Sequence, residues 1–145
     1  MTNRIQKGIL AGIIATLIFS LFTMIIPFIG FPKMSPPAML ADMMKIPVVA
    51  AWVLHFMIGI VFAFLYIFII SKYLNKVNNS ILKGVIFGIL AFIIGQILII
   101  VLGKLFYMPP SVDNIMFMMI GSILGHVVFG ISIVLLIKNE MRQIE

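Results

Sequence analysis

Four long apolar runs constrain this chain more than any other feature of its sequence. Each run has 22 or 23 residues, and any charged residue in it lies close to one end. As an α-helix rising 1.5 Å per residue, such a run is roughly 33–35 Å long, enough to cross the ~30 Å hydrocarbon core of a bilayer. The four predicted membrane spans are Ile5–Ile26, Val48–Ile70, Ile81–Leu102 and Ile115–Ile137.

Composition excludes a water-soluble fold. Of the 145 residues, 63% are hydrophobic and only 10% are charged, whereas a soluble domain has about 25% charged residues. Lipid offers no hydrogen bonds to backbone groups, and the runs are too long and too uniformly apolar for barrel strands, so we expect helices. The prediction is an all-α integral membrane protein, a four-transmembrane-helix bundle forming a single membrane domain over residues 1–145.

Basic residues are unevenly divided between the two sides of these spans. Three lie on one side, at Lys33, Lys45 and Lys104. The positive-inside rule places the other side, with both termini, in the cytoplasm of a multi-pass plasma-membrane protein. The net charge of +6 is thus a topology signal, which predicts membrane lipids with anionic headgroups as partners and no nucleic acid. The seven residues on the cytoplasmic side are Arg4, Lys7, Lys72, Lys76, Lys83, Lys138 and Arg142.

The two halves of the chain share a pattern that predicts tandem two-helix repeats over residues 5–72 and 81–138. Both open with Lys-Gly-x-x-x-Gly, and each carries one of the two aspartates and one of the two histidines. Because each unit crosses the membrane twice, both would enter it in the same orientation, with a pseudo-two-fold axis along the membrane normal. The matched pairs are Asp42 with Asp113, His55 with His126, and Gly59 with Gly130.

Prolines mark the first external connection. Pro36 and Pro37 predict the start of a short helix with Ala38–Met44 as its body, and Pro47 suits the first turn of the second span. In the second unit, Ser111 is expected to cap a helix that continues directly into the membrane.

A polar layer is predicted inside the membrane, toward the external side. Small residues recur at every fourth position of the first span and in part of the third, which allows close backbone contact between lipid-embedded helices. These rows of residues, called ridges here, end at Ser20 and Gln96. Both should lie at the same depth as the histidines, roughly 10–12 Å below the external surface. The ridge residues are Gly8, Gly12, Thr16 and Ser20 in the first span, and Gly84, Gly88 and Gln96 in the third.

Two interpretations of His55 and His126 follow from this layer. Neutral histidines that hydrogen-bond to the serine, the glutamine or backbone carbonyls can join transmembrane helices without any ligand. Alternatively, two imidazoles at equal depth on different helices could hold haem b, or another metal or a quinone. A glycine one turn after each histidine leaves room there for a flat ligand or for another backbone. The supporting residues for such a cofactor are Gly59, Gly130, Ser20 and Gln96.

Other chemistry has less support in the sequence. Met39 and Met43 would share one helical face, and their thioethers suit Cu(I), so a copper site is a further alternative. Asp42 and Asp113 each precede a histidine by 13 residues, about 20 Å along a continuous helix, and are expected at the external surface. With no cysteine and no acid beside a serine or histidine, the sequence favours a protein that is not an enzyme.

Three short stretches carry a resemblance. They are the opening Lys-Gly-x-x-x-Gly, residues 31–34 (FPKM) with Met39-Leu40 in the first connection, and residues 52–59 (WVLHFMIG) at the second span. In these the chain resembles a group of uncharacterised small four-span bacterial inner-membrane proteins, a family of unknown function. The resemblance implies a bacterial inner-membrane protein and brings no established activity or site.

Three functions are compatible with these features. The first is a non-enzymatic accessory or assembly-associated membrane subunit, whose partners are other membrane subunits or further copies of the chain. The second is a protein that binds haem b, another metal or a quinone through His55 and His126. The third is a small carrier or channel, which would require the polar layer to be hydrated.

Overall fold

The computed structural model describes residues 2–108 and 114–142, whose regular secondary structure is entirely helical. Four helical stretches are long and apolar enough to cross a membrane, and they exceed the predicted spans by at most three residues at either end. The prediction of an all-helical protein with four helices able to cross a membrane is therefore confirmed. The elements are α1 (Thr2–Ile25), the 3-10 turn η1 (Ile26–Ile29), α2 (Pro36–Met44), α3 (Val48–Leu65), the π-helical turn η2 (Tyr66–Ile70), α4 (Ser71–Tyr73), α5 (Ser80–Leu105) and α6 (Ile115–Arg142).

The short helix α2 forms where the prolines predicted it. Pro36 and Pro37 occupy its first turn, and the Ser35 hydroxyl accepts a hydrogen bond from the Ala38 N–H at 3.4 Å. Lys45 ends the helix in the left-handed conformation, with φ of 55°. The local sequence signals of this connection are thus confirmed.

The starts of α3, α5 and α6 can be compared with the sequence signals only in part. Asn79 caps α5, because its side-chain oxygen accepts from two N–H groups of the first turn at 2.9 and 3.2 Å. Pro47 directly precedes α3. Ser111 and Asp113 lie outside the described residues, and α6 begins at Ile115.

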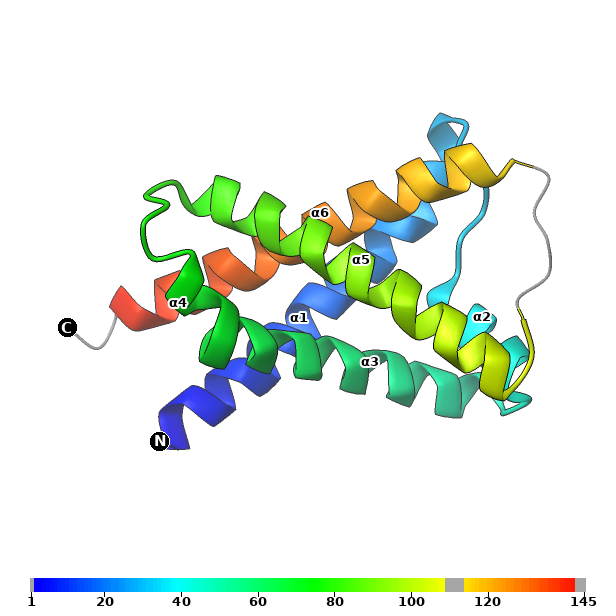
Figure 1. Cartoon of the computed structure of the whole chain (residues 1–145), viewed down its shortest axis with the longest axis horizontal. Helices are drawn as coiled ribbons and strands as arrows, with labels where there is room; N and C mark the ends of the chain where they lie inside the picture. The colour runs from blue at the N-terminus through cyan, green and yellow to red at the C-terminus, as the bar shows by residue number, and fades with distance from the viewer. Residues whose placement is uncertain (1, 109–113, 143–145) are drawn as a thin grey trace.

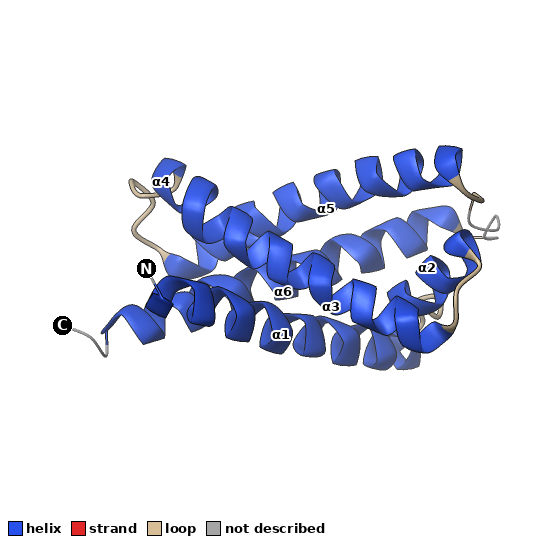
Figure 2. Ribbon diagram, turned by 90° about the horizontal axis from the view of Figure 1, so that it is seen from below, coloured by secondary structure: helices blue, strands red, loops and turns tan. Residues whose placement is uncertain are grey.

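The helix α1 is the centre of the bundle. It packs along α3 on one side and along α6 on another, and α6 in turn packs along α5. The helices α3 and α5 make no comparable contact. Figure 1 shows α5 and α6 crossing and then diverging, and Figure 2 shows α5 along one edge of the bundle. The start of α1, the end of α6 and the α4–α5 turn share one end of the molecule, and α2 lies at the other (Figure 1).

Glycines make the two tightest helix crossings. A Cβ added at Gly12 of α1 would lie 2.6 Å from the Cα of Ile60 in α3, and one at Gly88 of α5 would lie 2.6 Å from the Cα of Val127 in α6. No side chain fits at either point, so the backbones are in direct contact. The predicted packing role of the glycine ridge is confirmed at these positions.

The two crossings differ in register by one helical turn. Gly59 of α3 faces the side chain of Thr16, whereas Gly130, its counterpart in the predicted repeat, faces the backbone of Gly88. Phe92 stands at the position that corresponds to Thr16, and a phenyl ring there leaves no room for the same approach. The tandem repeat itself stays a sequence prediction.

The buried core joins all four long helices. Within this core, Tyr66 of η2 contacts Phe87 of α5, with ring centroids 5.0 Å apart, and so connects the second span to the third. A second cluster at the opposite end packs α2 on α3 and includes Leu102 of α5. The main core consists of Ala11, Ala15, Phe19, Ala63, Tyr66, Phe87, Phe129, Ile133 and Val134.

We predict that Gly88→Ala destabilises the protein because the new methyl group would overlap the backbone of α6. A cost of about 1–3 kcal/mol is expected for such overpacking, measured as a fall in the thermal midpoint of the detergent-solubilised protein. The control is Gly95→Ala in the same helix, where the nearest atom to the added Cβ is the His126 Nε2, at 3.4 Å. Equal effects of the two substitutions would contradict the crossing described here.

Candidate functional site

The two membrane histidines meet at one phenyl ring. His55 of α3 and His126 of α6 lie with their ring centroids 5.8 and 5.2 Å from that of Phe19, which belongs to α1. Phe19 is buried, with 6% of its surface exposed. The structure therefore brings the histidines together where α1, α3 and α6 converge.

His55 lies in a largely aromatic environment with a single polar contact. Trp52 and Phe56 lie beside its ring, at centroid distances of 6.1 and 6.4 Å. Its Nε2 is 3.4 Å from the hydroxyl of Ser20, which is the partner that the sequence predicted. This contact ties α3 to α1 at the level of the layer.

His126 is held by its own helix. Its Nδ1 lies 2.7 Å from the backbone carbonyl of Ser122, and its ring contacts Phe92 of α5 edge-on at 5.6 Å. The other ring nitrogen, Nε2, faces Gly95. Of the partners that the sequence left open for the histidines, His126 therefore bonds a backbone carbonyl and not Gln96.

For neutral imidazole rings, these hydrogen bonds assign the two histidines to opposite tautomers. A carbonyl can only accept, so the Nδ1 of His126 carries its proton and the Nε2 carries a lone pair. The Ser20 hydroxyl donates to the Thr16 carbonyl at 2.8 Å, which leaves its oxygen to accept from the Nε2–H of His55. The lone pair of His55 is then on Nδ1. Neither lone-pair nitrogen has a hydrogen-bond partner among the residues that the structure describes.

Gln96 lies apart from this layer. It is half-buried on α5, and its side-chain amide makes no hydrogen bond within the described part of the chain. It stands nine residues before the end of α5, about 13 Å along the helix axis and so within the hydrocarbon region. The pseudo-symmetric equivalence with Ser20 therefore does not extend to the contacts of these two side chains.

The glycines that follow the histidines serve helix packing. A Cβ on Gly59 would meet the side chain of Thr16, and a Cβ on Gly130 would lie 2.7 Å from the Cα of Gly88. Of the two uses that the sequence left open, close approach of another helix is the one observed. The space beside each imidazole on this side is filled by the neighbouring helix.

A porphyrin held by both imidazoles would conflict with Phe19. A bis-histidine haem lies in the plane midway between its two ligands. Phe19 is almost equidistant from the two rings, at 5.8 and 5.2 Å, and so lies near that plane. A porphyrin in that plane would compete with this phenyl ring for space.

The remaining candidate ligands are distant from the layer or packed. Met43 of α2 is fully buried, whereas Met39 is half-buried, so the two thioethers do not share an exposed surface. Asp42 is exposed on the same helix, outside the spans. Within the described residues, no three side chains of the His, Cys, Asp and Glu types gather at one point.

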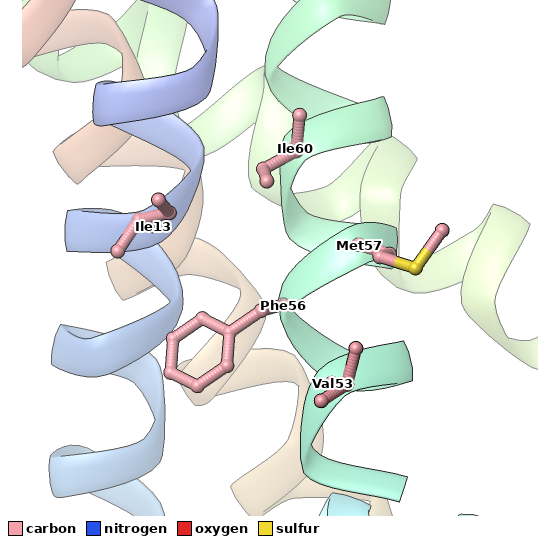
Figure 3. A pocket seen from close by; sticks show the side chains of 5 residues that line it. All are labelled: Ile13, Val53, Phe56, Met57 and Ile60. Carbon is pink, nitrogen blue, oxygen red and sulfur yellow. The ribbon is translucent and has the colours of Figure 1, made fainter. Parts of the chain in front are cut away.

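A shallow apolar groove runs between α1 and α3 on the outer side of the layer (Figure 3). Its volume is about 380 Å³, and no polar atom lines it. One wall is Phe56, which also contacts His55. The groove is suited to contact with lipid and offers nothing for chemistry. Its lining residues are Ile13, Val53, Phe56, Met57 and Ile60.

Sequence reasoning missed Phe19, the residue that organises the layer. A signal was present: Ala11, Ala15 and Phe19 form a second row of four-residue spacing beside the glycine row. The glycine row faces α3, whereas this second row belongs to the core that includes α6. A second row of small residues that ends in a phenylalanine, beside the glycine row, indicates a helix that packs on two neighbours.

A family model matches residues 2–141 of the chain. The protein belongs to the family of unknown function DUF6789. The predicted membership of an uncharacterised family is thereby confirmed. No curated protein and no solved structure matches the chain.

We predict that Ser20→Ala weakens the DUF6789 bundle by about 0.5–1.5 kcal/mol, the usual range for an interhelical hydrogen bond in a membrane protein. The matched control is Ser132→Ala, because among the described residues the Ser132 hydroxyl bonds only to the Val128 carbonyl of its own helix, at 2.8 Å. Thermal unfolding in detergent measures both. A larger loss for the control would contradict the role given to the His55–Ser20 contact.

Proposed function

We propose that this DUF6789 protein is a non-enzymatic, accessory or assembly-associated subunit of a larger complex in the bacterial inner membrane. The observation that carries the proposal is the unsatisfied amide of Gln96 on α5. An uncompensated amide in an apolar medium costs several kcal/mol. Lipid tails cannot supply the missing bonds, so a partner outside the protomer is the source that remains.

The position of α5 supports an external partner. The helix lies along the edge of the bundle (Figure 2), and its only extensive contact with another long helix is with α6. Only 22% of its apolar window is buried inside the chain, the same low share as in the Val48–Tyr73 span. Side-chain amides are known to join transmembrane helices, because each can donate and accept a hydrogen bond across the interface.

The orientation that fits this proposal has both termini in the cytoplasm. Seven basic residues lie at the end of the molecule that holds the start of α1 and the end of α6, and three lie toward the end that holds α2. In the same proposal the chain descends from two tandem two-helix units, whose later divergence includes Phe92 in place of a small residue.

One observation favours a second candidate, the binding of a small ligand or metal ion at the histidine layer. The lone pairs assigned to His55 Nδ1 and His126 Nε2 have no partner among the described residues. Neutral imidazole nitrogens of this kind accept hydrogen bonds or coordinate metals. Haem is the least compatible of these ligands because of Phe19, and a carrier or channel would need a path past the same ring.

We predict that the purified protein, expressed with ample haem and then titrated with haemin, shows no low-spin haem spectrum. Phe19 occupies the region that the porphyrin requires, so oxidised and dithionite-reduced samples should lack a sharp Soret band with split α and β bands. Phe19→Ala serves as the comparison, because it opens that region. A bis-histidine spectrum from the unmodified protein would show that the layer is not closed.

The assembly proposal predicts that Gln96→Leu releases the chain from its complex. In mild-detergent extracts of native membranes, the unmodified protein should migrate on blue-native gels well above its 16.2 kDa protomer, and the variant should migrate lower. Gln96→Asn retains the amide and should retain the larger species. An unmodified protein that runs only as the protomer would refute the proposal.

A further inference from the structure

We propose that α5 mediates parallel self-association of this protein, with the Gln96 amides of neighbouring copies hydrogen-bonded to each other. The inference rests on the proposed assembly function and names the partner as a second copy of the chain. It is carried by the arrangement of exposed residues on α5 around the unsatisfied amide.

A row of residues on the face of α5 opposite α6 has regular spacing, and we call it the seam. Ile97 and Val101, which are 56% and 45% exposed, flank it. Counting from the helix start, its members follow one another at intervals of four, three, four, three and four residues. This is the heptad spacing of a helix that packs along another helix in a left-handed coiled coil. The seam consists of Leu82 (48% exposed), Ile86 (38%), Ile89 (43%), Ile93 (48%), half-buried Gln96 and Ile100 (51%).

The seam and the α6 interface occupy different faces of α5. The residues that meet α6 include Gly84 and Gly88, which contact the backbone of α6 directly. The core residue Phe87 contacts Phe129 of α6 and Tyr66 of η2. The seam is turned away from these contacts, and α3 does not pack along α5. Self-association would therefore leave the fold of the protomer unchanged.

A second copy is the partner that best fits a single amide in this seam. All copies enter the membrane with one orientation, so Gln96 of one helix automatically lies at the depth of Gln96 in the next. A primary amide carries both donors and acceptors, and two of them can satisfy each other reciprocally. One polar residue in an otherwise apolar heptad seam also fixes the register of the helices.

The seam ends where the membrane interface begins. Lys104 follows Ile100 by four residues and is exposed near the external end of α5. Its ammonium group can extend into the headgroup region, where water and salt weaken repulsion between copies. The six seam positions carry no charge, so no charge repulsion in the hydrocarbon region opposes the contact.

Cysteine cross-linking in native membranes tests this inference, because the chain has no cysteine of its own. We predict that Ile93→Cys and Ile100→Cys form disulfide-linked dimers on mild oxidation. The control is Val101→Cys, which lies next to Ile100 at the same depth and is 45% exposed but flanks the seam rather than belonging to it. Adding Gln96→Leu to Ile100→Cys should weaken association about ten-fold, the effect of losing one to two interhelical hydrogen bonds, whereas Gln96→Asn should preserve it.

The outcomes separate this inference from the proposed function. Equal cross-linking at positions 100 and 101 would indicate random collision and overturn the seam. Differently tagged copies should co-purify from mild detergent. If they do not, while Gln96→Leu still reduces the size of the native complex, the partner is another protein and self-association is wrong. An unchanged thermal midpoint for Gln96→Leu excludes misfolding as the cause.

Discussion

The structure depends on one constraint: lipid tails form no hydrogen bonds, so polar groups in the hydrocarbon region must find hydrogen-bond partners within protein. On α1 the hydroxyls of Thr16, Ser20 and Thr23 each donate to a carbonyl of the same helix, at 2.7, 2.8 and 2.9 Å. Because these bonds are local, the hydroxyls behave as small residues and allow close packing. His126 likewise bonds within its own helix. The Gln96 amide and the lone-pair nitrogens of the two histidines are the exceptions, and Gln96 lies on α5, whose main contact with another long helix is with α6.

Because these side chains form their hydrogen bonds within their own helix, the helices can pack closely against one another. Apolar side chains gain nothing by leaving lipid for protein, so helices associate through van der Waals contact and close backbone approach. Gly12 and Gly88 provide that approach in the two crossings. With glycine on one face and Phe19 beside it, α1 can pack on both α3 and α6. The ring of Phe19 then fills the point where the histidines meet, and the same packing closes the layer to a large cofactor.

Sequence reasoning predicted what depends on depth and local chemistry. The spans follow from apolar length, α2 follows from its prolines and serine cap, and the contact of His55 with Ser20 follows from their shared depth. It did not predict what depends on how the helices are displaced and rotated relative to one another. The α5–α6 crossing is displaced along the helices by one turn relative to the α1–α3 crossing, and Gln96 does not bond His126 although the spacing pattern is unchanged. Phe19 was missed for a related reason, since apolar residues surround it in the sequence and only its facing direction sets it apart.

The most direct test of the closed histidine layer is a solid-state NMR spectrum of the protein in lipid bilayers with ¹⁵N-labelled histidine. The chain contains only two histidines, so each set of ring-nitrogen signals belongs to His55 or His126. The account predicts two neutral rings in opposite tautomers, with the proton on Nε2 of His55 and on Nδ1 of His126. Two rings in the same tautomer, a charged imidazolium or metal-shifted nitrogen signals would contradict it.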